Sequence, residues 1–190
     1  DALAGRTVES GAIPAGLAVS AGTGDNMAAA LGLGAVVGDV VMSVGTSGVV
    51  SVVSATPTAD PSGQVAGFAD ATGEFLPLVC TLNAGQVLDS VRALLGVTFE
   101  AFDELARAPM SADDALTLLP FLAGERTPNR PHARGVLSGI SLTNLTPESL
   151  ARASVESIAC GLAVGLGAVV GCGVDVGRIL LVGGGAKLHA

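Results

Sequence analysis

Asp25 and Asn26 follow two glycines at the end of an apolar run, and these residue types suit acid–base chemistry at the edge of a sheet. Residues 17–21 predict a buried strand of a parallel or mixed sheet, and a helix is predicted to begin at Asn26. A carboxylate at the end of such a strand faces a crevice, where it could accept a proton from a hydroxyl or hold a metal-bound water. Alternatively, Asp25 only caps the helix, since Asp and Asn are common caps.

A second glycine turn, at residues 45–48, joins two apolar, β-branched runs and predicts a hairpin over residues 39–53. Its tip holds Gly45, Thr46 and Ser47. Successive backbone N–H groups in a glycine turn form an anion-binding concavity, and the two hydroxyls add donors, so the tip suits phosphate oxygens. The alternative is an ordinary hairpin turn, because Gly and Ser are common in all turns.

A third glycine cluster, at residues 183–185, follows the apolar strand predicted over residues 178–182. Ligands of open α/β sheets bind at the carboxyl ends of such strands. The cluster is neither a dinucleotide fingerprint nor a Walker loop, because no Gly-x-Gly-x-x-Gly opens a helix within a βαβ unit and no Gly-Lys-Ser/Thr occurs. Both of the usual nucleotide-binding signatures are therefore absent.

The elements that must position these turns have a mixed α/β pattern. Further strands are predicted over residues 65–69 and 75–80, and helices over residues 83–95 and 99–107. Residues 56–63 and 127–135 are rich in turn-forming or charged residues and are predicted to be surface loops.

A long apolar helix is predicted to start with Thr146 as its cap and Pro147 at its first position. Its uncharged stretch, residues 158–174, contains a Gly-x-x-x-Gly pattern and leaves a transmembrane reading open. That stretch is short for a span, however, and the helix carries charges at its start. We therefore expect a buried core helix, although the mean hydropathy of +0.64 is high.

Composition excludes several classes of function. The 190 residues suffice for one domain with a substantial core. The net charge of -8, with only nine Lys and Arg, argues against nucleic acid and anionic membranes as partners. The three cysteines form no Cys-x-x-Cys pair and are read as reduced thiols, as in a cytoplasmic protein. With two histidines, a zinc site or a Cys-His nucleophile has little support.

Taken together, residues 21–26, 45–48, 124–128 and 183–186 resemble the carboxyl-terminal domain of the FGGY family of carbohydrate kinases. Their order and spacing match over nearly the whole chain. The Asp25-Asn26 pair and the Glu125-Arg126-Thr127-Pro128 segment resemble the xylulokinase branch more than the glycerol kinases.

The resemblance implies an actin-like ATPase (ribonuclease H-like) fold, with a mixed sheet and helices on both faces. In such kinases two domains close on ATP, Mg²⁺ and the sugar. Residues 1–190 would be the second, nucleotide-binding domain, truncated at its carboxyl end and without the amino-terminal sugar-binding domain. The chain alone is then expected to be inactive, and a homodimer remains open.

The resemblance also assigns roles to individual residues. Asp25 would be the general base that takes the proton from a sugar hydroxyl, and Asn26 would help to hold the sugar. The residues expected to contact the nucleotide are Gly45, Thr46 and Ser47 at the phosphates, Gly184, Gly185 and Ala186 at the adenosine, and, on weaker motifs, Gly85 and Asp89. Mg²⁺ would arrive with ATP and is assigned no protein ligand. Residues 125–128 are expected to anchor a loop, and Arg126 could either pair with a nearby carboxylate or face the cleft.

Three functions remain open from the sequence. The first is ATP-dependent phosphorylation of a ketopentose, D-xylulose, to its 5-phosphate. The second changes only the substrate, to gluconate, ribulose, glycerol or another polyol. The third is an actin-like ATP-binding module that transfers no phosphoryl group to a small molecule.

Overall fold

Four short, mostly apolar runs form the central sheet in the computed structural model, which describes residues 3–109 and 116–190. Valine dominates these runs, and β-branched side chains pack well on a pleated surface. The sheet order is β5-β4-β3-β8, in which β8 runs parallel to β3 and the other neighbours are antiparallel. The strands are β3 (Val40–Val44), β4 (Gly48–Val52), β5 (Leu78–Thr81) and β8 (Ile179–Val182).

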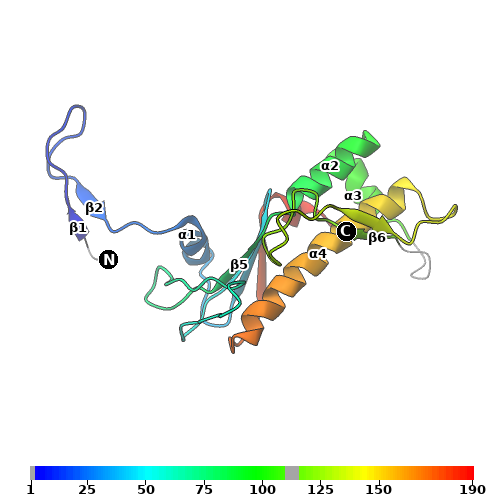
Figure 1. Cartoon of the computed structure of the whole chain (residues 1–190). Helices are drawn as coiled ribbons and strands as arrows, with labels where there is room; N and C mark the ends of the chain where they lie inside the picture. The colour runs from blue at the N-terminus through cyan, green and yellow to red at the C-terminus, as the bar shows by residue number, and fades with distance from the viewer. Residues whose placement is uncertain (1–2, 110–115) are drawn as a thin grey trace.

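Helices cover both faces of this sheet (Figure 1). On one face Ala30 of α1 is buried with Val41 and Val53. On the other face α4 lies across the sheet and packs against α2 and α3. The helices are α1 (Asp25–Gly32), α2 (Gly85–Leu95), α3 (Phe99–Ala106) and α4 (Pro147–Gly171), and a 3₁₀ helix, η2 (Gly184–Lys187), follows β8.

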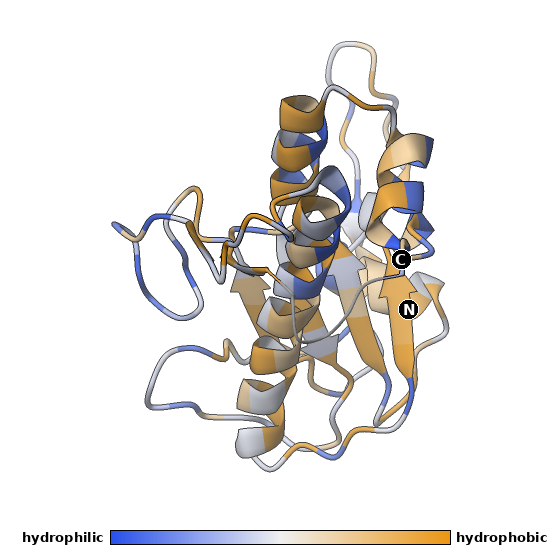
Figure 2. Cartoon of the chain, turned by 90° about the vertical axis from the view of Figure 1, so that its right-hand side faces the viewer, coloured by the Kyte–Doolittle hydropathy of each residue, from blue (hydrophilic) through white to orange (hydrophobic). Residues whose placement is uncertain are grey.

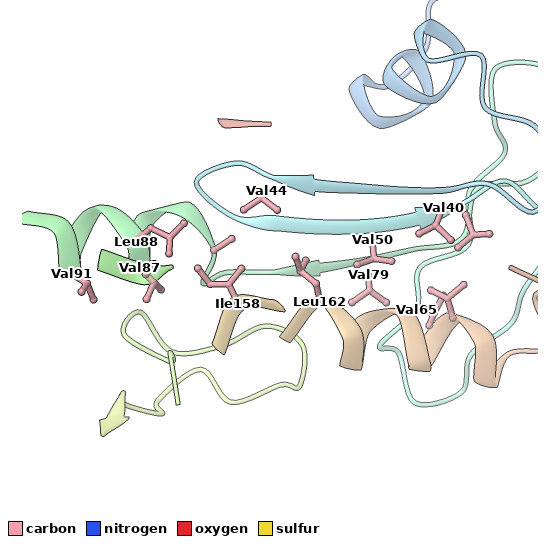
Figure 3. Packing of buried hydrophobic residues seen from close by; sticks show 14 of the residues in the cluster. Val40, Val44, Val50, Val65, Val79, Val87, Leu88, Val91, Ile158 and Leu162 are labelled. Atoms are coloured by element: carbon pink, nitrogen blue, oxygen red, sulfur yellow. The ribbon is translucent and has the colours of Figure 1, made fainter. Parts of the chain in front are cut away.

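The main core lies between the sheet and α4 (Figure 3). Val50 and Val79 point from the strands toward Ile158 and Leu162 of the helix. All four side chains are buried. Figure 2 shows the strands of the sheet largely in the hydrophobic colour, with hydrophilic segments mainly in loops and along one side of the helices.

The amino end of α4 is capped as its sequence predicts. The Thr146 hydroxyl accepts a hydrogen bond from the Ser149 N–H at 3.2 Å, and Pro147 is the first helical residue. By length and composition alone α4 could cross a membrane, and it is the one helix of the described residues for which this holds. Its Ile158, Leu162 and Val169 are buried in the core, which confirms the predicted core helix.

Two glycines of α4 provide a matched test of this packing. A Cβ on Gly165 would lie 3.2 Å from Val79 Cγ1, whereas a Cβ on Gly167 would meet nothing within 4 Å. We expect Gly165→Leu to lower the free energy of unfolding by about 2–3 kcal/mol, because the added carbons overpack the sheet. Gly167→Leu should leave the free energy of unfolding unchanged or raise it by up to about 1 kcal/mol, because leucine has a higher helix propensity than glycine. Urea unfolding of both variants measures the difference, and equal midpoints would contradict the packing of α4 on the sheet.

An ion pair ties β8 to the start of β3. Arg178 donates from Nε and Nη2 to the two carboxylate oxygens of Asp39, at 2.8 and 2.9 Å. This bond from Arg178, with a further hydrogen bond from the Val36 N–H, lowers the pKa of Asp39 to about 2. Asp39 is therefore charged at neutral pH and holds the parallel strand pair in register.

The predicted strand at residues 17–21 differs from the structure. Only Ala18–Ser20 is extended (β2), and it pairs antiparallel with β1 (Leu3–Arg6) in a separate two-stranded sheet. The residues of β2 are exposed, and the hairpin stands apart from the central sheet (Figure 1). The expectation of a buried strand was wrong, because an apolar run does not reveal which surface will cover it.

Two smaller differences concern the middle of the chain. Residues 65–69 form no strand and make only isolated bridges, from Ala66 to Leu78 and from Ala69 to Phe75. An antiparallel pair that the sequence did not predict joins β6 (Thr117–Leu119) to β7 (Val136–Ser138).

Candidate active site

The tip of the β3–β4 hairpin is built as an open turn of small residues. Gly45 N–H donates to the Ser47 carbonyl at 3.1 Å and closes the turn, while Thr46 and Ser47 are exposed. Within residues 3–109 and 116–190, the backbone N–H groups of Thr46 and Ser47 have no hydrogen-bond acceptor. Two N–H groups and two hydroxyls therefore face solvent together, which is the donor set that phosphate oxygens require.

The start of α2 supports this tip from behind. Gly85 N–H donates to the Gly45 carbonyl at 2.8 Å, and Gln86 N–H donates to the Thr46 carbonyl at 3.3 Å. A Cβ on Gly85 would lie 2.5 Å from the same Gly45 oxygen, so only glycine permits this approach. Gly85 thus positions the tip through the backbone.

Asp89 lies on the exposed side of α2. Its side chain is 71% exposed and pairs with Arg92 at 3.4 Å, one turn further along the helix. Among the described residues, no hydrogen bond or ion pair joins Asp89 to the hairpin tip. Its predicted role at the nucleotide stays a prediction.

The third glycine turn lies beside the same end of the sheet. Because β8 runs parallel to β3, with Val182 opposite Ser43, residues 183–186 follow directly alongside Val44. Gly183 has a φ of 95°, and a Cβ there would lie 2.5 Å from the Val44 carbonyl oxygen. A Cβ on Gly185 would collide with the Val44 side chain. The turn carrying Gly184, Gly185 and Ala186 is therefore fitted closely against the residue that precedes the hairpin tip.

Asp25 is the first residue of α1, and the cap position belongs to Gly24. One oxygen of the exposed Asp25 carboxylate accepts the Asn26 N–H at 2.8 Å, so its other oxygen has no hydrogen-bond donor among the described residues. The alternative that Asp25 serves as the helix cap is not what the structure shows. The carboxylate is left accessible to a ligand.

Asp25 and Asn26 line a cavity of about 470 Å³ on the α1 side of the sheet. Its lining also includes Phe68, Cys80 and Arg126. Cys80 of β5 is paired with Val49 of β4. Val49 in turn lies two residues after Ser47 of the tip. The carboxylate cavity and the phosphate-type turn are therefore at the same end of the sheet.

Sequence reasoning missed Cys80 as a member of this cavity, and it left open whether Arg126 faces the cleft. Burial raises the pKa of the Cys80 thiol; the nearby Arg126 opposes this rise in pKa, and Asp25 adds to it. Both charges thus act on the same thiol. The signal in the sequence was the cluster of charge at residues 125–126, for which loop anchoring was favoured over a position at the cleft.

Glu125 confirms that anchoring role. Glu125 is 3% exposed, and its carboxylate accepts N–H groups from Leu82 at 2.6 Å and from Arg126 at 2.7 Å, together with the Asn83 amide at 2.9 Å. These bonds fasten the loop to the residues that directly follow β5. Within the described chain, no group of three or more His, Cys, Asp or Glu side chains could hold a metal ion.

The amino-acid sequence of the chain is similar to those of known carbohydrate kinases. The sequence model of the FGGY family of carbohydrate kinases, C-terminal domain, matches residues 40–190. The xylulose kinase of Streptomyces coelicolor is 47% identical over 173 residues, which are 90% of this chain and 34% of that protein. A more distant relative, the gluconokinase of Bacillus subtilis, is 27% identical over 182 residues, 87% of this chain and 35% of its own length. The chain thus spans about a third of the length of these curated relatives.

Solved structures share the fold. The crystal structure of xylulose kinase from Bifidobacterium adolescentis superposes with a TM-score of 0.82 and 47% identity, over 94% of this chain and 35% of that one. This likeness confirms the predicted actin-like α/β fold, with its mixed sheet and helices on both faces.

Proposed function

The chain belongs to the FGGY family of carbohydrate kinases, and from this premise we propose that it forms the carboxyl-terminal, nucleotide-binding half of an ATP-dependent ketopentose kinase. The reaction is the conversion of D-xylulose to D-xylulose 5-phosphate, in the cytoplasm. The observation that carries the proposal is the position of Asp25, whose accessible carboxylate lines a cavity at the same end of the sheet as the phosphate-type turn. A base and a phosphate cradle at one edge are what phosphoryl transfer to an alcohol requires.

Each part of this edge has a step to perform. Asp25 accepts the proton of the primary hydroxyl as that oxygen attacks the γ-phosphate. Asn26, half-buried beside it, binds sugar hydroxyls through its amide. The N–H groups and hydroxyls of Thr46 and Ser47 hold phosphate oxygens of ATP, and the turn at residues 184–186 contacts the adenosine.

Mg²⁺ fits this site only together with ATP. The cavity is lined by a single carboxylate, Asp25, and the described residues provide no cluster of metal ligands. Hard cations of this size keep several waters and bind substrate phosphates in such sites. When bound, Mg²⁺ neutralises charge on the phosphates, and the residues of this chain orient the reacting groups around it.

The choice of D-xylulose rests on similarity. The xylulose kinase of Streptomyces coelicolor shares 47% identity with the chain, and the gluconokinase of Bacillus subtilis shares 27%. Most sugar contacts are expected to come from a preceding domain, so gluconate, ribulose or glycerol remains the alternative substrate. The catalytic role of Asp25 is the same for all of them.

We expect the full-length protein to release ADP fastest with D-xylulose when D-xylulose, ribulose, gluconate and glycerol are compared. The isolated 190-residue chain should bind ATP-Mg²⁺ weakly in calorimetry and release no sugar-dependent ADP, because closure of two domains is needed to exclude water from the γ-phosphate. A coupled ADP assay measures both forms. Sugar-dependent ADP release by the isolated chain would refute the two-domain proposal, whereas a preference for gluconate would correct the substrate.

A further inference from the structure

Arg126 is the only cation among the residues that line the Asp25 cavity, and Asp25 is the only anion there. Seven of the eight arginines in the sequence donate a side-chain hydrogen bond or form an ion pair within the described residues. The exposed guanidinium of Arg126 makes none. An arginine without a partner, facing a cavity that also holds a carboxylate, is poised to bind an external anion.

The position of Arg126 is set by its neighbour. Glu125 receives the Arg126 N–H at 2.7 Å and the Leu82 N–H at 2.6 Å through the same carboxylate oxygen, and its own backbone pairs with Arg130 in both directions at 2.9 Å. The Asn83 amide also donates to the Gly124 carbonyl, at 2.6 Å. The backbone of Arg126 is thus fixed to the end of β5, the strand whose Cys80 forms a wall of the cavity.

This cavity is the place where a phosphoryl group must pass. A hydroxyl deprotonated by Asp25 has to meet the γ-phosphate close to that carboxylate, and two negative groups then approach each other. The chain has only nine Lys and Arg, so few side chains could offset this charge. A guanidinium can bind two phosphate oxygens bidentately and adds a positive charge, which a single backbone N–H cannot do.

We infer that Arg126 binds the phosphoryl group during its transfer, on the sugar side of the site and opposite Asp25. The inference rests on the proposed kinase function and adds a catalytic residue to it. Arg126 stabilises charge that is greatest as the phosphoryl group moves, so it affects kcat more than the KM for the sugar.

The first test compares Arg126→Gln and Arg126→Lys with Arg134→Gln in the full-length protein. Arg134 is a matched control, since it is exposed, does not line the cavity and bonds only the Ala133 carbonyl, at 3.1 Å. We expect Arg126→Gln to lower kcat about tenfold, because one charge-assisted contact is lost. The KM for D-xylulose should change little. Arg126→Lys should recover part of the loss in kcat, and Arg134→Gln should resemble the wild type. Unchanged kcat in Arg126→Gln would overturn the inference.

The second test needs no kinase activity. Alkylation of Cys80 by iodoacetamide is followed by site-resolved mass spectrometry, with and without inorganic phosphate, against potassium chloride at equal ionic strength. The exposed Cys160 on α4 serves as an internal reference. Phosphate should slow the alkylation of Cys80 several-fold in the wild type and in Arg134→Gln, but not in Arg126→Gln. Comparing rates with and without phosphate inside each variant removes any change in intrinsic thiol reactivity.

The two tests separate failure of the inference from failure of the proposed function. Phosphate protection that depends on Arg126, in a protein without sugar-dependent ADP release, would uphold the anion site and reject the kinase. Normal ADP release with protection that is absent, or equal in Arg126→Gln, would uphold the kinase and reject the role of Arg126.

Discussion

Replacing Asp25 with asparagine in the full-length protein is expected to lower kcat for D-xylulose by a factor of roughly 100 or more, the usual contribution of a general base. Asparagine keeps the size of the side chain and the oxygen that accepts the Asn26 N–H at 2.8 Å, so α1 should still begin at the same residue. What is lost is the ability to take up the proton of the sugar hydroxyl. Steady-state ADP release measures the effect, and the KM values for ATP and sugar should change little.

Asp175→Asn is the matched control for this variant. Asp175 is exposed and lies between α4 and β8, at the opposite end of the sheet from the hairpin tip, so its loss should leave kcat unchanged. A kinase whose kcat survives Asp25→Asn would not use Asp25 as its base. Intact ATP binding in both variants, with no sugar-dependent ADP release in the wild type, would instead favour the ATP-binding module.

The parts of the fold that the sequence predicted are those whose pattern is local. The hairpin of β3 and β4 follows from two valine-rich runs around a glycine turn, and α4 follows from Thr146 and Pro147 at its start. Whether an apolar run joins the central sheet carries no such local pattern. Residues 17–21 looked like a core strand because they are apolar, yet β2 pairs with a nearby segment and remains exposed.

The candidate site shows the same division. Asp25 and the turn at residues 45–47 could be singled out because neighbouring glycines mark a close approach of backbone and ligand. The position of Arg126 in the Asp25 cavity could not be predicted in this way, because it depends on Glu125. The Glu125 carboxylate accepts the N–H of Leu82, which lies 43 residues earlier in the chain. A buried carboxylate that accepts several N–H groups has no sequence signature beyond a charge in an apolar region.

The role of Gly85 is likewise visible only in three dimensions. It was predicted to lie beside the nucleotide, whereas the structure shows its N–H on the Gly45 carbonyl at 2.8 Å, behind the hairpin tip. We therefore infer that Gly85 acts on ATP through the shape of the tip. This predicts that a single methyl group at residue 85 weakens nucleotide binding without touching the nucleotide.

Gly85→Ala is expected to raise the KM for ATP about ten- to a hundredfold, since displacement of a binding group by about 1 Å has effects of this size. The added Cβ would lie 2.5 Å from the Gly45 oxygen and 3.2 Å from its carbonyl carbon, and both are backbone atoms that cannot rotate away. Either α2 or the tip must shift. The free energy of unfolding should also fall, by about 2–3 kcal/mol, as in other overpacked sites.

Gly167→Ala separates this local effect from a general cost of losing a glycine. A Cβ there meets nothing within 4 Å, and alanine favours a helix, so the variant should bind ATP as the wild type does and unfold at the same or a higher urea concentration. If Gly85→Ala lost stability but kept its KM for ATP, the tip would not hold the phosphates, and the nucleotide would have to rely on the turn at residues 184–186. If it lost neither, the contact between α2 and the tip would itself be wrong.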